Sequence, residues 1–345
     1  MSETAAWEKT SLACESKKIT DDPDIREGTT IIKTKIDIPA TLALIGATLC
    51  WGGVPVMIKY LARGDLVPDG FTANMVRYPI AALLYLPWLI AGIRKGQLRG
   101  LWLAALLPAV VNLGAQTLWA AAPYHLDAGL MAFLLRLCVV WSIIGAFIVF
   151  KDERRLARSG FFWAGAALAL SGFVIMSWHS ITGSGSASGK GIAIIFFCGV
   201  CLGLYGVCVR YVMHRLPPLV VFSVVSLYTS LGLVAMAPLG EPSSVLRLPP
   251  LACTVLIVSA VVGIAIAHGL FYFAVQRLGV AICYLMLMTT PFVSYLGAYL
   301  WLGEVFTTIQ WIGGGVLLIG SALAVNAQTH LKPTQKIDAA EVPTD

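Results

Sequence analysis

Long apolar runs, each about as long as a membrane-spanning helix, alternate with short polar segments along most of the chain. A helix satisfies its own backbone hydrogen bonds, so about 20 consecutive apolar residues can cross the hydrocarbon core of a bilayer. The pattern predicts ten such helices, joined mainly by short loops. Their expected ranges are 37–61, 71–93, 101–122, 128–150, 161–178, 191–213, 219–238, 251–275, 281–302 and 309–327.

Composition supports this interpretation. Apolar residues make up 58 % of the chain and charged residues only 12 %, which is more apolar than a soluble core needs. Residues 1–36 are polar, mix both signs of charge and contain no apolar run that could serve as a signal peptide, so we expect a disordered tail. The sequence therefore predicts an all-α polytopic membrane protein.

The chain also contains a long internal repeat. When it is shifted by about 152 positions, Gln116 falls on His268 and Trp119 falls on Phe271. Other pairs at this or a similar shift are Gly52 with Gly203, Lys59 with Arg210, Gly145 with Gly297, Gly165 with Gly313, and Gly172 with Gly320. Five spans per copy is an odd number, so the second copy must enter the membrane from the opposite side, as an inverted repeat.

The repeat defines the expected domains. The first five-helix repeat covers residues 37–180 and the second covers 191–328, with a Gly/Ser-rich linker at 181–190 between them. The remaining C-terminal residues, 329–345, form a short polar tail.

Basic residues cluster in the loops after the second and fourth spans. These residues are Arg94, Lys95, Arg99, Lys151, Arg154, Arg155 and Arg158. Short loops rich in Lys and Arg stay in the cytoplasm, so we expect both termini to be cytoplasmic. The net charge of +6 is then a signal of topology, and we expect no nucleic-acid partner.

Several positions resemble a known family. The first span carries Trp51, Gly52 and Lys59 in LCWGGVPVMIKYL, and the second carries Arg77. Other features of the same kind are Ala81 and Ala82, the segment from Pro291 to Gly303 and Glu304, and the segment from Gln310 to Gly313. In order, these features resemble the drug/metabolite transporter superfamily of the EamA type, over residues 38–327. The sequence departs from that pattern in the fourth span, where Val139 and Val140 stand at the position of Pro291.

This resemblance implies a carrier of small metabolites, commonly an exporter, in a plasma membrane such as a bacterial inner membrane. Inverted repeats also let a central site open to either side in turn, which is alternating access. The expected partners are a small-molecule substrate and the lipid bilayer, and a homodimer is left open.

Arg136 is the deepest cation, about eight residues inside the fourth span. A guanidinium can bind a substrate carboxylate or phosphate in bidentate fashion. Alternatively, backbone carbonyls satisfy it and its role is structural. For Arg77 a packing or helix-end role competes with substrate contact, and Lys59 is expected at the interface. The three cations could together form a cationic outer vestibule.

Gln116 and His268 are a polar pair related by the repeat, so one cavity could hold both. Each could instead make only an interhelical hydrogen bond. Trp119, Phe271 and Tyr272 lie one turn further on and could form the walls of the site, or pack in the core. Weaker candidates are Trp51 and Asn74.

No Asp or Glu lies well inside a predicted span. Proton coupling would therefore need His268, and facilitated transport or exchange is favoured. Glu153 and Glu304 are expected to cap helices or pair with arginines. The cysteines are interpreted as small hydrophobic residues, and the sequence contains no nucleotide-binding, catalytic or metal-ligand motif, so neither a cofactor nor an enzyme is expected.

Two kinds of cargo fit these residues. Arg136 favours an amino-acid-like or other carboxylated solute, whereas the aromatic content would also suit a hydrophobic amphiphile or drug. A channel or membrane scaffold would not require two inverted halves with matched polar positions. An intramembrane enzyme would require a partnered nucleophile or a pair of carboxylates at depth, which the spans lack.

Overall fold

The computed structural model describes residues 37–62, 66–122, 134–182, 189–213, 216–302 and 307–327. These residues belong to one compact unit, 36–331, and they form helices and no strand. The predicted tails, the linker residues 183–188 and Glu304 lie outside the described residues.

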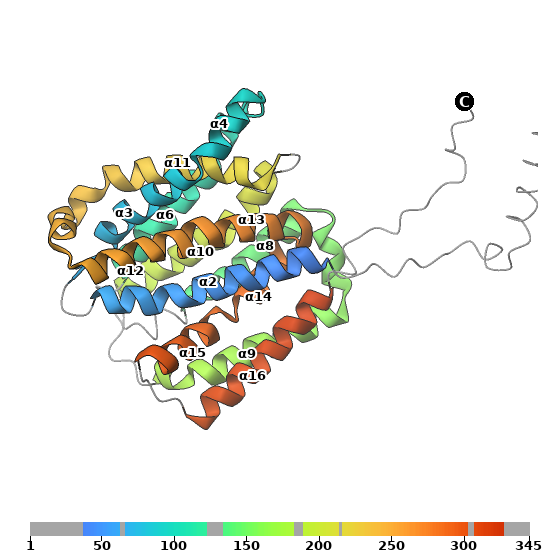
Figure 1. Cartoon of the computed structure of the whole chain (residues 1–345). Coiled ribbons are helices and arrows are strands. Elements are labelled where there is room, and N and C mark those ends of the chain that lie inside the picture. Colours follow the sequence, from blue (N-terminus) through green and yellow to red (C-terminus); the bar gives the residue numbers. More distant parts are fainter. Residues whose placement is uncertain are drawn as a thin grey trace, which may run out of the picture. The chain divides into compact units, whose positions relative to one another are not determined.

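Figure 1 shows the helices in sequence colours. The first half consists of α2 (Ile38–Ala62), α3 (Gly70–Leu84), α4 (Leu86–Arg94), α5 (Leu101–Ala104), α6 (Leu106–Ala121), α8 (Cys138–Val149), the 3₁₀ helix η4 (Glu153–Arg158) and α9 (Gly160–Thr182). The second half consists of α10 (Gly189–Met213), α11 (Pro218–Ala235), the 3₁₀ helices η5 (Ala237–Leu239) and η6 (Pro242–Arg247), α12 (Pro250–Ala260), the π-helix η7 (Val261–Ile266), α13 (Ala267–Leu278), α14 (Val280–Leu287), α15 (Thr290–Leu302) and α16 (Thr308–Asn326).

The prediction of a polytopic all-α membrane protein is confirmed. In the described part, 8 helices are long and apolar enough to cross a membrane, or up to 9 if α3 and α4 form one span. The fourth expected span is represented by α8, a shorter apolar helix, because residues 123–133 are outside the described part. The count of ten therefore stays a prediction.

Two of the predicted spans depart from straight α-helices. The second bends by 45° between α3 and α4, where Pro87 in the first turn of α4 lacks an N–H and cannot continue α3. The eighth contains η7 at its centre and ends at Gly279, whose φ of 90° suits a residue without a side chain.

The last helices of the two halves pack against each other along their glycines. A Cβ on Gly165 would meet the backbone at Gly320, and a Cβ on Gly172 would meet the backbone at Gly313. The contact is antiparallel, and it is also reciprocal, because the repeat equates Gly165 with Gly313 and Gly172 with Gly320. Such self-complementary contact is what a two-fold relation between the halves produces. Figure 1 shows α9 and α16 side by side.

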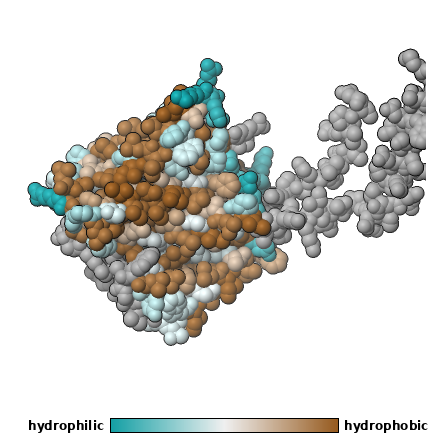
Figure 2. Space-filling view, in the orientation of Figure 1, coloured by the Kyte–Doolittle hydropathy of each residue, from teal (hydrophilic) through white to brown (hydrophobic). Residues whose placement is uncertain are grey.

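The two halves are interleaved. Helix α10 packs on α6 and α8 of the first half, while its counterpart α2 packs on α13 and α15 of the second. Glycines permit these contacts. A Cβ on Gly203 would lie 2.5 Å from the carbonyl oxygen of Cys138, and a Cβ on Gly52 would lie 2.4 Å from the side chain of Val293. Hydrophobic side chains cover the face formed by α2, α11, α12 and α13, and hydrophilic residues gather at its ends (Figure 2). This is the surface that a bilayer requires.

Candidate functional site

A cavity of about 230 Å³ lies between the two halves. Helices α2, α3, α6 and α8 contribute to its wall from the first half, and α10, η7, α13, α14 and α15 contribute from the second. Seven of the nine candidate residues line it: Trp51, Arg77, Gln116, Trp119, Arg136, His268 and Phe271. The other two, Asn74 and Tyr272, lie behind the wall.

Arg136 precedes the first turn of α8 and reaches across to the second half. Its Nη1 donates a hydrogen bond to the carbonyl oxygen of Leu287, at 3.3 Å. Its Nε is buried and has no hydrogen-bond partner. One backbone carbonyl therefore satisfies part of this guanidinium, and its Nε is left without an acceptor.

Arg77 is held more tightly. It lies within α3 rather than at its end, and it is only 5 % exposed. Nη1 donates to Oδ1 of Asn74 at 3.2 Å, and Nη2 donates to the carbonyl oxygen of Ser259 at 3.4 Å. Its Nε also lacks a partner. The bond to Asn74 explains why that residue, which does not line the cavity, belongs to the site.

A chain of side-chain amides continues from Asn74. Its Nδ2 donates to Oε1 of Gln116 at 3.4 Å, and Nε2 of Gln116 donates to Oδ1 of Asn112 at 3.5 Å. Asn112 in turn donates to the hydroxyl groups of Tyr78 and Thr229. Gln116 therefore makes an interhelical hydrogen bond, with Asn74, and also lines the cavity.

His268 owes its orientation to the π-helix. Its Nδ1 lies 2.9 Å from the carbonyl oxygen of Ile264. A carbonyl only accepts hydrogen bonds, so Nδ1 carries the hydrogen and Nε2 is the acceptor of the neutral ring. The ring stacks on Phe222 with centroids 5.1 Å apart, and it meets Trp51 edge-on at 5.1 Å. Nε1 of Trp51 also donates a hydrogen bond to the carbonyl oxygen of Gly263 in η7, at 2.8 Å.

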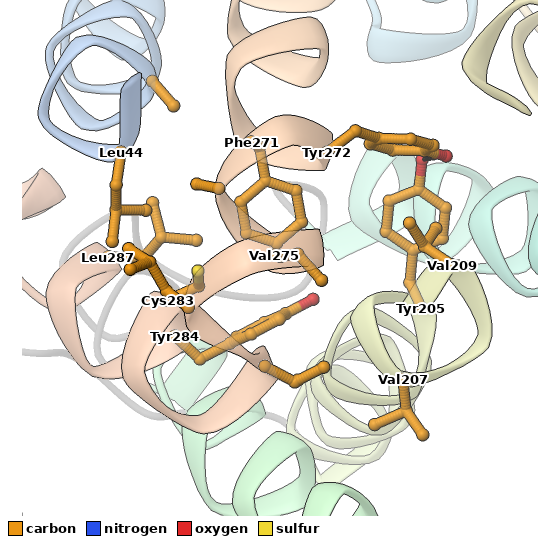
Figure 3. Close-up of a cluster of buried hydrophobic side chains, with 14 of the residues drawn as sticks. Leu44, Tyr205, Val207, Val209, Phe271, Tyr272, Val275, Cys283, Tyr284 and Leu287 are labelled. Atoms are coloured by element: carbon orange, nitrogen blue, oxygen red, sulfur yellow. Dashed lines mark hydrogen bonds between the residues drawn. The ribbon is translucent and has the colours of Figure 1, made fainter. Parts of the chain in front are cut away.

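Phe271, Tyr205 and Tyr284 of the cavity wall form an aromatic cluster with Tyr272, and Figure 3 shows how its rings lie. Phe271 packs edge-on against Tyr284, with centroids 5.8 Å apart. The hydroxyl groups of Tyr205 and Tyr272 meet at 2.8 Å. Consecutive residues of a helix point in different directions, so α13 directs Phe271 towards the cavity and Tyr272 into the core. Tyr272 is fully buried there. Tyr272 thus supports the wall through Tyr205 rather than forming it.

Five polar residues at the cavity were not predicted from the sequence: Tyr78, Asn112, Tyr205, Tyr284 and Thr290. Thr290 is the most informative, since its Oγ1 is buried and lacks a hydrogen-bond partner. Asn112 lies one helical turn before Gln116, and this i, i+4 spacing could have identified it. The lone hydroxyl groups carry no comparable signal in the sequence.

An ionic network around Glu153 joins the halves. The Glu153 carboxylate accepts hydrogen bonds from the backbone N–H groups of Val280 and Ala281, each at 2.8 Å, and pairs with Arg210. Arg210 also pairs with Asp152 at 2.6 Å. Burial raises the pKa of the Glu153 carboxyl, while Arg210 and the two N–H groups favour its charged form. The prediction that Glu153 caps a helix or pairs with an arginine is confirmed.

The Lys59 side chain is outside the described residues, so a vestibule that includes it stays a prediction. Among the described residues, Arg77 and Arg136 are the cations that line the cavity, and no Asp or Glu lines it.

A membrane-embedded bundle of two related halves, with a mainly apolar cavity that carries a few polar groups between them, defines the class of a multi-pass transporter. Residues 38–178 and 189–326 each match the model of the EamA-like transporter family. The chain belongs to that family and contains two EamA-like domains. It is therefore a transporter rather than an enzyme, with a small-molecule substrate and a bilayer around it.

Two further similarities agree. The chain is 24 % identical over 238 residues to a protein of Streptantibioticus cattleyicolor named "Probable terminal-alkyne amino-acid exporter"; the match covers 69 % of this chain and 77 % of the relative. A crystal structure of a protein matches with a TM-score of 0.62 and 19 % identity, covering 83 % of this chain and 96 % of the other. The second similarity concerns the fold alone.

Proposed function

We propose that this protein is a carrier that exports small carboxylated metabolites, amino-acid-like solutes among them, through the central cavity. The observation that carries the proposal is a pair of arginines at the cavity, Arg77 and Arg136, each with a buried Nε that has no partner. Guanidinium groups suit planar carboxylates because they can donate two parallel hydrogen bonds. The name of the relative as an amino-acid exporter supports both the solute class and the direction.

The remaining wall fits the rest of such a solute. Trp51, Trp119 and Phe271 offer apolar surface for a side chain, and Gln116 and His268 offer neutral polar contacts. A few polar groups set in a mainly aromatic wall are typical of small-molecule sites.

We further propose that transport proceeds by alternating access between inverted repeats at 37–180 and 191–328. Interleaved halves can exchange two mirror-related arrangements around one central site. Basic loops favour cytoplasmic termini. The bacterial source of the relative favours a bacterial inner membrane.

The test compares native protein with Arg136→Gln in proteoliposomes. The panel of labelled solutes contains amino acids, organic acids, phosphorylated metabolites and neutral amphiphiles. We expect anionic or zwitterionic solutes to be carried, and Arg136→Gln to lower their transport at least about tenfold, because a hydrogen bond to a charged group is lost. Saturable counterflow would identify a carrier and argue against a channel.

Arg94→Gln is the matched control, since Arg94 is exposed in the last turn of α4, away from the cavity. We expect it to transport like the native protein. The proposal would be contradicted if the protein transports neutral amphiphiles and Arg136→Gln leaves that transport unchanged. In that case the aromatic wall carries the function, and the protein is an exporter of amphiphiles or drugs.

A further inference from the structure

The charges around the cavity do not balance. Arg77 and Arg136 bring two positive charges to its wall, and no carboxylate among the described lining residues offsets them. Every hydrogen-bond acceptor that these guanidinium groups have is neutral: the Asn74 amide oxygen and the carbonyl oxygens of Ser259 and Leu287. Buried charges are costly unless they are paired, so the site favours an occupant that supplies negative charge.

Three unpartnered polar atoms belong to residues that line this same cavity. They are Nε of Arg77, Nε of Arg136 and Oγ1 of Thr290, and each is buried. Buried polar groups nearly always have partners, so a group of orphans in one cavity indicates where a ligand's acceptors bind. Arg77 and Thr290 are 5 % and 4 % exposed, respectively, which makes this a built feature of the interior.

The two guanidinium groups are anchored on different helices. Arg77 is fixed by Asn74 within α3 and by Ser259 of α12. Arg136 is fixed by Leu287, at the end of α14, three residues before Thr290. The wall thus presents two separately supported cationic groups. The Thr290 hydroxyl group is close in the sequence to Leu287, whose carbonyl oxygen accepts the hydrogen bond from Arg136.

A single carboxylate would leave one of these cations without a counter-charge. A zwitterionic amino acid would also bring an ammonium group, for which the described wall holds no carboxylate. The cavity, at about 230 Å³, is smaller than the roughly 300–1,000 Å³ of pockets for drug-sized ligands. The occupant that best fits this charge and volume is small and doubly negative.

We propose that the preferred cargo is a small organic dianion, such as a dicarboxylate, whose negative charge is shared between Arg77 and Arg136. This rests on the proposed function, because it assumes that the central cavity carries the solute. It narrows the solute class from any carboxylated metabolite to those with net charge of about −2.

The test uses solutes of equal size and different charge. Succinate, its monoamide succinamate and asparagine have similar volumes and carry about −2, −1 and 0 charges at neutral pH, while glycerol phosphate supplies a dianion on a single group. Counterflow in proteoliposomes and competition for binding in detergent are measured with each. We expect native protein to prefer succinate over succinamate by about tenfold or more, because one charged hydrogen-bonded contact distinguishes them.

Arg77→Gln tests the second charge. We expect it to reduce the preference for succinate over succinamate to nearly one, while succinamate is still carried. Arg77→Lys, which keeps the charge, should retain much of the preference. If glycerol phosphate binds and succinate does not, both negative charges bind at one point. That result would overturn the proposal that Arg77 and Arg136 share the charge of the solute.

The native protein alone can decide the matter even if Arg77→Gln does not fold. Equal or better transport of succinamate or asparagine by the native protein would overturn the dianion inference. If Arg136→Gln still abolished that transport, the proposed anion carrier would stand. If no anion is transported and Arg136→Gln does not change the transport of any solute, both the dianion inference and the proposed anion carrier are wrong.

Discussion

At the scale of single residues, the site depends on side chains that bond backbone carbonyls of other helices. Trp51, Arg77 and Arg136 each donate to a carbonyl oxygen more than 100 positions away in the chain. Helix interiors rarely offer free carbonyls, but η7 shifts the hydrogen-bond pattern and exposes some of its own. Tyr85 uses the same segment, bonding the carbonyl oxygen of Ala265 at 2.8 Å.

Trp51→Phe tests this anchoring. The variant keeps an aromatic ring but loses the hydrogen bond to Gly263, so we expect about 1 kcal/mol of destabilisation and faster amide hydrogen exchange in η7. Thermal unfolding and hydrogen exchange in detergent measure both effects. Trp102→Phe is the control, because Trp102 is on the surface and lies outside the cavity. Equal effects from both variants would show that the hydrogen bond has no particular role.

At the scale of helices, glycines determine how closely the two halves approach. Gly172 and Gly315 both lie in the α9 and α16 pair but have opposite surroundings. A Cβ on Gly172 would lie 2.3 Å from the backbone nitrogen of Leu317, whereas a Cβ on Gly315 would meet nothing within 4 Å. Small residues at such contacts let transmembrane helices pack backbone to backbone.

Gly172→Ala should therefore separate α9 from α16 and cost about 1–3 kcal/mol, the usual penalty of overpacking. Gly315→Ala should be neutral or slightly stabilising, because alanine favours a helix over glycine. The midpoint of thermal unfolding in detergent distinguishes the two. A neutral Gly172→Ala would mean that this contact is looser than its geometry indicates.

At the scale of the whole molecule, the network around Glu153 links the halves at the N-terminal end of α14. The carboxylate caps α14 and pairs with Arg210 of α10, while Glu153 itself follows α8 of the first half. The Arg210 guanidinium also lies over the Phe150 ring, at 4.4 Å from its centroid. Removal of one partner of a buried ion pair is strongly destabilising, because it leaves the rest unsatisfied.

Glu153→Ala should loosen this end of the molecule. Cys283, fully buried in α14, should then react with a maleimide several times faster, as measured by mass spectrometry of its peptide. Asp152→Ala is the matched control, because Asp152 pairs with the same arginine but is about half exposed, and it should have a much smaller effect. Unchanged reactivity in Glu153→Ala would show that the network does not hold this end closed.

The sequence by itself determined the class of fold, because the length of apolar runs is set by the thickness of a bilayer and does not depend on distant contacts. It also identified much of the cavity: the repeat paired Gln116 with His268, and the rarity of charge inside spans drew attention to Arg136. Only the tertiary structure showed which faces of the helices meet. It turned Tyr272 into the core, placed Asn74 behind Arg77, and brought the unpartnered hydroxyl of Thr290 to the cavity. These outcomes depend on helix rotation and on a π-helix, and both are decided by packing between segments far apart in the chain.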